Sequence, residues 1–306
     1  MGAGGIGGFF GARLARSGEA VAFIARGEHL RAIRAAGLRL RSVEGDFAVD
    51  APATDAPAEV PGLIGPVDLV LFCVKLYDTE PAAEALRPLL GPDTAVLSLQ
   101  NGVAKEGVLA RILGPERVLA GLCSAFVAIE APGVIRHSHG GSIVFGEPDG
   151  RTTERAARFL EAGRKAGFRI ELSADIRRAQ WEKYLMILAL SGLSALTRRP
   201  MGEIRTCPES RRLYRTVFEE VAAVARAEGV DLGDDIVPRT MALGDALRPD
   251  SYSSMYHDVT RGRRLELEWL HGHAVRLAAR HRILTPALFA LYAGLRPAAV
   301  AAERGG

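Results

Sequence analysis

An α/β domain followed by an all-helical domain is the fold that this sequence predicts, and three observations support it. A glycine-rich turn, Gly2-Ala3-Gly4-Gly5-Ile6-Gly7, stands at the start of the chain. Short strand-like runs then alternate with helical patterns as far as Leu172, which is typical of a mostly parallel sheet flanked by helices. Only helical patterns follow Asp175. We therefore expect one domain over residues 1–172 and a second over residues 173–306.

The turn from Gly2 to Gly7 matches the G-x-G-x-x-G pattern of dinucleotide-binding proteins. Its first glycine permits a tight strand-to-helix turn, the second lets the backbone approach a pyrophosphate, and the third lets the helix pack on the sheet. The expected helix, residues 9–17, would turn free amides and its positive dipole end toward phosphates. The apolar run at residues 20–25 is of strand type. These elements predict a Rossmann-type domain.

The first strand of such a domain is the element that this sequence lacks. It should be an apolar run directly before the glycines, at the centre of the sheet, yet only Met1 precedes them. Without it, the neighbouring strands would expose apolar edges and the domain would fold poorly. We hypothesise that Met1 is a misassigned start or a truncation point and that the functional protein begins upstream. The alternatives are that another segment fills the gap, or that this chain is unstable and inactive.

Apolar periodicity predicts the other elements. Strands are expected at residues 67–74, 94–98, 117–122, 141–145 and 169–172, and helices of the first domain at 80–90 and 102–113. Helices of the second domain are expected at 176–197, 210–228, 236–247, 255–281 and 286–296. The last residues, 298–306, are typical of a frayed tail.

Composition favours small-molecule chemistry in the cytoplasm. The net charge of +3 is small, and the basic residues are scattered among acids, so no nucleic-acid partner is expected. The longest uncharged apolar stretch, residues 184–196, is too short to span a bilayer, and no leader pattern precedes the glycines. Cys73, Cys123 and Cys207 are too dispersed for a zinc site or a disulfide framework. We expect them to be buried small hydrophobes in a reducing compartment, with no metal.

Lysine and asparagine are scarce in this chain. Four of the 39 basic Lys and Arg residues are lysines, and Asn101 is the only asparagine. An ammonium can lose its proton on desolvation whereas a guanidinium effectively cannot, so each lysine is a candidate for acid–base chemistry. Chance placement in polar helical surroundings is the preferred interpretation of Lys105 and Lys165. Lys75 and Lys183 carry the functional interpretation.

Three predicted strands end in residues suited to a cofactor. Arg26 follows the second strand, where NAD-binding proteins place an acid, and a guanidinium suits the 2′-phosphate of NADP. Glu28 competes for this role but falls in the turn beyond. Lys75 could neutralise phosphate charge, and Asn101 offers both a donor and an acceptor. A solvated loop charge and a left-handed turn residue are the structural alternatives for Arg26 and Asn101.

Lys183 is the strongest candidate for chemistry. If residues 176–197 form one helix, the amine shares an apolar face with Met186, Ile187 and Leu190. Desolvation on such a face should lower the pKa of the lysine toward the working pH, which suits a general acid. A lysine that snorkels from a core helix is the alternative.

Several of these segments, taken in order, resemble the ketopantoate reductase family over nearly the whole chain. The resemblance rests on Gly2–Gly7, the Phe72–Lys75 strand end, Gln100-Asn101-Gly102, residues 131–137, Trp181-Glu182-Lys183, and Ser251–Met255 followed by Glu266. It implies an NADP(H)-dependent reduction of a 2-oxo acid to a 2-hydroxy acid, in this family 2-dehydropantoate to pantoate for pantothenate biosynthesis.

The resemblance also implies residue roles, with Lys183 as the catalytic proton donor. The implied cofactor-binding residues are Gly2, Ala3, Gly4, Gly5, Ile6, Gly7, Arg26, Lys75, Asn101, Val127 and Glu266. The implied substrate-binding residues are Asn101, Lys183, Ile187, Ser191, Ser251, Ser253 and Ser254. Ser254 is expected to cap a helix that begins at Met255, where free amides favour an anion.

The chain departs from the family pattern at three positions that hold asparagines elsewhere. Ile187, Ser191 and Met201 replace them, so we expect a more apolar pocket and a changed substrate preference rather than a changed reaction. Three alternatives stay open: another 2-oxo acid reductase of this family, a related 6-phosphogluconate-dehydrogenase-like reductase, or an NADPH-binding sensor without turnover. The assembly is also open, with a homodimer as one option.

Overall fold

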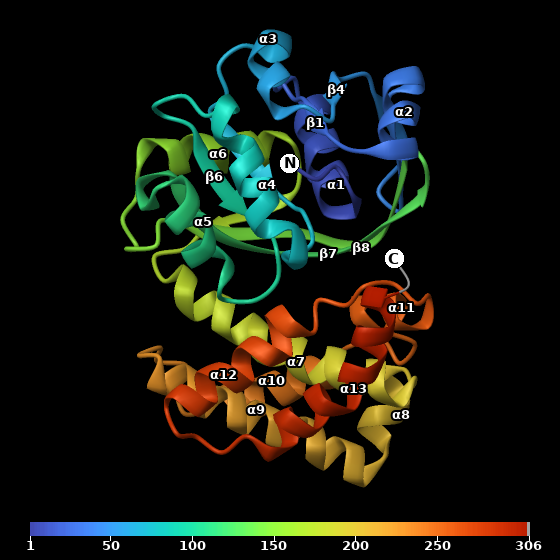
Figure 1. Cartoon of the computed structure of the whole chain (residues 1–306), viewed down its shortest axis with the longest axis vertical. Helices are drawn as coiled ribbons and strands as arrows, with labels where there is room; N and C mark the ends of the chain where they lie inside the picture. Colours follow the sequence, from blue (N-terminus) through green and yellow to red (C-terminus); the bar gives the residue numbers. More distant parts are fainter. Residues whose placement is uncertain (305–306) are drawn as a thin grey trace. The chain divides into compact units, whose positions relative to one another are not determined.

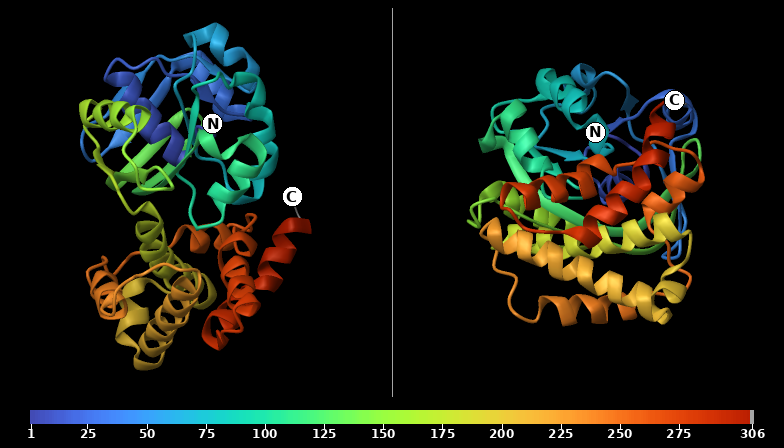
Figure 2. Two further views of the ribbon diagram at one scale, coloured as in Figure 1. Left: turned by 90° about the vertical axis from the view of Figure 1, so that its left-hand side faces the viewer. Right: turned by 60° about the horizontal axis from the view of Figure 1, so that its bottom comes forward.

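The structure, a computed structural model, describes residues 1–304 and divides into two compact units (Figure 1). The first comprises Met1–Asn101 and Lys105–Ile176, and the second comprises Gly102–Ala104 and the chain from Arg177 onward. The first unit combines strands with helices, whereas the described part of the second forms helices only (Figure 2). The prediction of a Rossmann-type α/β fold followed by a helical region is confirmed.

A seven-stranded mixed sheet runs through the first unit in the order β3-β2-β8-β7-β6-β5, with β9 beside β8. Its strands are β2 (Leu38–Ser42), β3 (Phe47–Val49), β5 (Leu69–Phe72), β6 (Ala95–Ser98), β7 (Val118–Ala131), β8 (Val134–Gly146) and β9 (Arg169–Leu172). Most pairs are parallel, and the exceptions are β2 with β3 and β7 with β8. A separate parallel pair is formed by β1 (Phe23–Ile24) and β4 (Ala53–Thr54).

The long β7–β8 hairpin corrects the prediction of two short strands at 117–122 and 141–145. Its strands span 14 and 13 residues and are joined through Pro132 and Gly133. Gly133 has a φ of 73°, which a two-residue turn after proline requires and glycine adopts without strain. Beyond its buried start, β7 alternates exposed and half-buried residues, so apolar runs alone could not reveal its length.

The helices of the first unit cover the sheet. They are α1 (Gly5–Arg16), α2 (Gly27–Ala36), α3 (Val60–Ile64), α4 (Thr79–Leu86), α5 (Lys105–Leu113) and α6 (Glu154–Lys165). α1 buries Phe9, Phe10 and Leu14 in the core beside residues of β7 and β8. Phe9 packs on His137 of β8 with ring centroids 4.5 Å apart, and Phe10 meets Phe168 edge to face at 5.0 Å, and these contacts hold the helix in place behind the glycine turn.

Three residues, Met1–Ala3, lie between β5 and β1, where the first strand of a Rossmann-type domain is expected. The Met1 amino group donates to the Leu71 carbonyl at 2.9 Å, and the Met1 carbonyl accepts from the Cys73 amide at 2.9 Å. On the other side, the amides of Gly2 and Ala3 donate to the Ile24 carbonyl at 3.1 and 2.9 Å. Residues 1–3 therefore bridge β5 and β1 by hydrogen bonds on both sides, although they are not a strand of either sheet.

The second unit is built around α7 (Ile176–Thr197), whose bounds match the prediction. The other helices are α8 (Met201–Thr206), α9 (Pro208–Ala227), α10 (Ile236–Asp245), α11 (Ser254–Thr260), α12 (His273–Arg280) and α13 (Pro286–Arg304). A single π-helical turn, η5 (Glu268–Gly272), leads into α12. In the described part of the chain, no helix is long and apolar enough to cross a membrane.

Two helix predictions for this unit are wrong. Residues 255–281 do not form one helix, because α11 ends at Thr260 and irregular backbone with Gly262 at a φ of 62° separates it from η5. Residues 298–304 are not a frayed tail, since α13 continues to Arg304 and buries Leu295 and Ala299. Residues 305–306 of the predicted tail lie outside the described part of the chain.

His271 lies in the core of the second unit as a neutral imidazole. Its Nε2–H donates to the Leu188 carbonyl of α7 at 2.8 Å, and its Nδ1 has no hydrogen-bond partner within residues 1–304. Burial lowers the pKa of His271 to about 4, although the bond to Leu188 opposes this shift. The folded protein therefore keeps this ring uncharged at a pH at which the unfolded chain protonates it.

We predict that His271 makes the protein less stable in mild acid. Because the folded pKa is depressed below the ordinary value of 6.5, its stabilisation is complete above pH 6.5 and is lost as pH falls toward 4. The free energy of unfolding should drop by about 2 kcal/mol between pH 7 and pH 5 from this residue alone. Urea unfolding at both pH values measures it. His271→Gln, which keeps a donor for Leu188, should remove that part of the pH dependence, and an unchanged pH dependence would contradict the assignment.

Candidate functional site

The glycine turn is shaped by close backbone contacts. A Cβ on Gly7 would stand 2.3 Å from the Gly2 carbonyl oxygen, and Gly2 itself has a φ of 83°. A Cβ on Gly4, by contrast, would meet no atom within 4 Å, and this glycine is the N-cap of α1. No side chain caps α1 and no acid lies in its first turn. The turn therefore offers free amides and open space, which fits the pyrophosphate of a dinucleotide.

His29 supports this turn and was missed by the sequence reasoning. Its Nε2–H donates to the Ala3 carbonyl at 2.8 Å, while its Nδ1 accepts the Gly133 amide at 3.0 Å. Burial lowers the pKa of His29, in keeping with a neutral ring that must accept at Nδ1. The imidazole thus ties the glycine turn to the tip of the β7–β8 hairpin. No local pattern marks it, because both partners are backbone groups distant in sequence.

Arg26 is exposed at the N-cap of α2, directly after β1. Its rival Glu28 forms an ion pair with Arg31 one turn along the same helix. Within residues 1–304 the Arg26 guanidinium forms no salt bridge, and its exposure leaves it accessible to an anion. Of the two candidates for contact with the cofactor ribose, the geometry favours Arg26.

The strand ends that carry Lys75 and Asn101 lie at one edge of the sheet, because β5 and β6 are parallel neighbours. The buried amide of Gln100 joins them, donating to the Val74 carbonyl at 3.0 Å and to the Thr79 hydroxyl at 2.8 Å. Lys75 and Asn101 are both half-buried. Gln100 is a positioning residue that sequence reasoning noted only as part of a motif.

Val127 lies in β7 beside the start of α1. Its carbonyl oxygen is 2.9 Å from the position of a Cβ on Gly5, so the hairpin closes against the glycine turn. All the predicted cofactor residues belong to the first unit except Glu266, which belongs to the second.

Two expectations about individual residues are wrong. Lys105 does not lie in polar helical surroundings: its side chain is fully buried, with Nζ 2.8 Å from Glu106 Oε1. Cys207 is exposed rather than buried, whereas Cys123 is buried and Cys73 half-buried. Burial raises the pKa of the Cys73 thiol to about 12, so this thiol is neutral and unreactive.

Lys183 lies on α7 in a half-exposed stripe with Met186, Ile187 and Leu190. The helix buries its opposite side, which includes Tyr184 and other apolar residues. An amine in this stripe is flanked by apolar side chains at the i+3, i+4 and i+7 positions and still faces outward from the core. The predicted role of Lys183 as a proton donor needs an amine that a substrate can reach, and a half-exposed position allows this.

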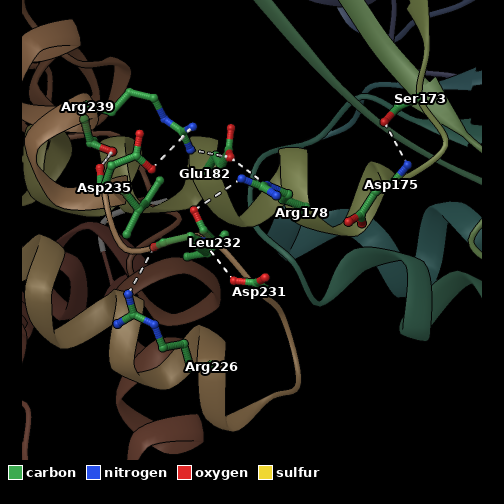
Figure 3. A network of polar contacts seen from close by, with 12 residues as sticks. Ser173, Asp175, Arg178, Glu182, Arg226, Asp231, Leu232, Asp235 and Arg239 are labelled. Carbon is green, nitrogen blue, oxygen red and sulfur yellow. Dashed lines mark hydrogen bonds and ion pairs between the residues drawn. The ribbon is translucent and has the colours of Figure 1, made fainter.

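The residue before Lys183 is held by two arginines (Figure 3). Glu182 Oε1 accepts from Arg178 at 3.1 Å and from Arg239 of α10 at 2.6 Å. Arg178 also donates to the Leu232 carbonyl at 3.4 Å, and Arg239 approaches Asp235 at 3.9 Å. This network anchors the first turns of α7 to α10 and its preceding loop, and so fixes the position of the helix that carries Lys183.

Two further hydrogen bonds attach predicted site segments to α7. The Tyr184 hydroxyl donates to the Leu270 carbonyl at 2.6 Å, within the π-helical turn that follows Glu266. The Ser194 and Ser253 hydroxyls are 2.7 Å apart. The segments that contain Glu266 and residues 251–254 are therefore both fastened to the helix that carries Lys183.

The cap of α11 corrects one prediction. Ser253, not Ser254, is the N-cap, and its Oγ accepts the Tyr256 amide at 3.1 Å. The helix begins one residue earlier than expected, so Ser254 is exposed in its first turn and Ser253 is buried. Ser251 is half-buried just ahead of the cap.

The positions that depart from the family asparagines are largely internal. Ser191 is 4% exposed and donates to the Ile187 carbonyl at 2.5 Å, while Met201 is fully buried in the core. Ile187 remains half-exposed on the Lys183 stripe. Across residues 1–304, no group of three or more His, Cys, Asp or Glu residues could hold a metal ion.

Two family models cover most of the chain. The model described as ketopantoate reductase PanE/ApbA matches residues 1–150, and its C-terminal counterpart matches residues 175–299. A 2-dehydropantoate 2-reductase from Halobacterium salinarum is 35% identical over 94% of each chain. A crystal structure of a PanE/ApbA family ketopantoate reductase from Ralstonia eutropha superposes with a TM-score of 0.91 at 37% identity, covering 99% of this chain and 98% of that one.

The fold extends to a more distant enzyme. A ternary structure of D-mandelate dehydrogenase with NADH and anilino(oxo)acetate gives a TM-score of 0.89 at 23% identity, over 99% of this chain and 97% of the other. At this identity the likeness shows a shared fold. The two family models and the closer relatives show more: the chain belongs to the ketopantoate reductase family.

Proposed function

We propose that this protein reduces a 2-oxo acid to the 2-hydroxy acid with NADPH, and that 2-dehydropantoate is the substrate. The observation that carries the proposal is the half-exposed Lys183, set among apolar side chains on a helix fastened at three places. Family membership supports the substrate, since the Halobacterium relative is named for it. A cytoplasmic role in pantothenate biosynthesis follows from that substrate.

The proposed roles follow from the geometry of each unit. The amides of the glycine turn and the guanidinium of Arg26 bind the phosphates, and Lys75 and Asn101 orient the remainder of the dinucleotide from the strand ends. When bound, the reduced cofactor supplies the hydride that the substrate carbonyl carbon accepts. Lys183 donates a proton from its ammonium to the carbonyl oxygen, which completes the hydroxyl, and then regains a proton from solvent.

A second candidate is the reduction of a more apolar 2-oxo acid by the same steps. It is favoured by the loss of asparagines at positions 187, 191 and 201, since a site that lacks hydrogen-bonding groups no longer selects a hydroxylated substrate strongly. Loss of NADPH absorbance with 2-dehydropantoate, compared with straight-chain and branched 2-oxo acids, distinguishes the two. A preference for the unhydroxylated acids in kcat/KM would favour the second candidate, and no turnover of any acid would overturn both.

The glycine turn provides a first prediction about cofactor binding. Gly4→Ala should fold normally, because its Cβ meets no atom within 4 Å, yet weaken NADPH binding by about tenfold or more if the pyrophosphate lies there. Gly7→Ala is the contrasting variant: its Cβ would clash with the Gly2 carbonyl and cost about 1–3 kcal/mol of stability. Titration of each variant with NADPH and urea unfolding separate the effects. Unchanged NADPH affinity in Gly4→Ala would contradict this placement.

Arg26 should set the choice of cofactor. We expect wild type to bind NADPH at least about tenfold more tightly than NADH, which corresponds to roughly 1.4 kcal/mol. Arg26→Ala should remove the preference by weakening NADPH binding alone. Fluorescence titration with both cofactors measures it, with Arg31→Ala, an exposed arginine paired with Glu28, as the control. Equal affinities in wild type would refute the role.

Lys183 should be needed for turnover and dispensable for NADPH binding. Lys183→Ala is expected to lower kcat by about 10² to 10⁴, the range for loss of a positioned acid. Lys183→Arg should not restore activity, because a guanidinium is too weak an acid. Lys165→Ala, at an exposed lysine paired with Glu19, is the control and should retain full activity. A fully active arginine variant would show that position 183 supplies charge alone.

A further inference from the structure

Leu270 joins separate parts of the second unit. It lies in the middle of the π-helical turn η5 and is buried. Its amide donates to the Glu266 carbonyl at 3.0 Å. Its carbonyl accepts from the Tyr184 hydroxyl at 2.6 Å and from the His273 amide. Leu270 therefore ties α7 to the segment that begins at Glu266.

A second buried hydrogen bond docks the same turn on α7. The next residue, His271, donates from Nε2 to the Leu188 carbonyl at 2.8 Å. Tyr184 and Leu188 are four residues apart, so they lie on one face of α7, one above the other. The two bonds, one helical turn apart, fix the position of η5 along that face.

A third part of the chain meets this junction. Residues Gly102–Ala104, here called the Gly102 loop, belong to the second unit, although Asn101 just before them belongs to the first. Gly102 has a φ of 86°, and a Cβ there would stand 3.2 Å from Leu270 Cδ2 and 4.0 Å from Tyr184 Cε2. The Leu270 side chain and the Tyr184 ring thus form a seat, the Gly102 seat, on which this glycine rests.

Tyr184 is held rigidly in the seat. Its side chain is fully buried, and Trp181 meets its ring edge to face with centroids 5.6 Å apart. Burial raises the pKa of Tyr184 far above its ordinary value, so the hydroxyl stays protonated and remains a donor to Leu270. Because a fully buried ring cannot touch a substrate, Tyr184 can serve a reaction only by placing other residues.

We propose that Tyr184 is a positioning residue for the reduction, which sets where the Gly102 loop lies relative to Lys183. The inference rests on the proposed function, in which Lys183 donates the proton and Asn101, directly before the loop, orients the cofactor. Tyr184 follows Lys183 in α7, so the seat is placed relative to the proton donor by adjacent residues of one helix. Displacing a reacting group by about 1 Å can lower a rate by about 10²-fold.

Tyr184→Phe tests the role with the least disturbance. The ring of the seat stays, and the Leu270 carbonyl keeps the His273 amide, so no buried acceptor loses its only donor. With the 2-oxo acid that wild type reduces best, kcat should fall about tenfold, because the reacting geometry is lost. The KM for that acid should change less than about threefold, because the groups that bind it remain. An unchanged kcat would overturn the proposal.

Tyr292→Phe is the matched control. Tyr292 of α13 donates to Glu268 Oε2 at 2.7 Å, so it also holds η5 by a tyrosine hydroxyl, but from α13 instead of α7. Each variant loses one hydrogen bond and should lower the unfolding midpoint by about 2–4 °C. Only Tyr184→Phe should lose kcat. Equal losses of kcat would show a general loosening of η5, and would overturn the positioning role.

Gly102→Ala disturbs the seat from the opposite side. Its Cβ would press on Leu270 and its backbone would be strained at a positive φ, so kcat should fall by about tenfold or more. If both substitutions displace the same loop, the double variant with Tyr184→Phe should lose at least about threefold less than the product of the single losses. A loss equal to that product would show two independent effects and contradict the shared seat.

Hydrogen exchange tests the seat without turnover. In the full chain without cofactor or substrate, the amides of the Gly102 loop should exchange at least about threefold faster in Tyr184→Phe than in wild type. In Tyr292→Phe they should exchange as in wild type. Unchanged exchange in Tyr184→Phe would overturn the seat, whatever the activity. A wild-type protein that reduces no 2-oxo acid, together with this exchange difference, would refute the proposed function and still support the seat.

Discussion

The first unit depends on the hydrogen bonds of three backbone residues. Met1, Gly2 and Ala3 join β5 to β1, and these bonds set the separation of the seven-stranded sheet from the β1–β4 pair. They also fix the start of the glycine turn, from which α1 runs back along the sheet. The placement of the glycine turn between β5 and β1 therefore depends on only a few backbone hydrogen bonds. A displacement of these three residues would move the amides of the glycine turn before it disturbed the remaining core.

The second unit solves the corresponding problem with one long helix. α7 carries Lys183 on an apolar stripe and is fastened on different sides through Glu182, Tyr184 and Ser194. Two of these bonds reach segments that have little regular structure of their own, the π-helical turn and the cap of α11. The Leu270 carbonyl accepts from both the Tyr184 hydroxyl and the His273 amide, so this bond ties α7 to the junction of the π-helical turn and α12. Three side chains of α7 thus fasten the helix that carries Lys183. Glu182 and Tyr184 are adjacent to Lys183, and Ser194 lies about three turns further along the helix.

Sequence patterns predicted the elements whose signal is local. The bounds of α7 follow from an uninterrupted helical pattern, and β6 and β9 follow from short apolar or alternating runs. The strand β2 was missed although Leu38 and Leu40 alternate with Arg39 and Arg41, so its period of two was available. The length of the β7–β8 hairpin could not be predicted in this way. The outer half of β7 pairs with β8, but its residues are exposed or half-buried, so no apolar run marks them.

The same distinction, between a local signal and a contact with a distant segment, applies to the predicted site residues. Those at strand ends or on a helix face, such as Arg26 and Lys183, could be proposed from position alone. His29 and Gln100 could not, because they act on backbone carbonyls and amides of segments remote in sequence. The burial of Lys105 could not be predicted either. Its ion-pair partner, Glu106, is the next residue in the chain, and both belong to an ordinary helical pattern.

Hydrogen bonds within the second unit already engage several of the side chains predicted to bind substrate. Ser191 donates its only proton to the Ile187 carbonyl, Met201 lies in the core, and Ser253 is engaged by Ser194 and the Tyr256 amide. Within residues 1–304 the hydroxyls of Ser251 and Ser254 form no side-chain hydrogen bond, and Ser254 is exposed. The Ser191 hydroxyl could donate to a ligand only after its hydrogen bond to the Ile187 carbonyl is broken. Serine at this position, where the family has an asparagine, therefore offers a ligand no free donor.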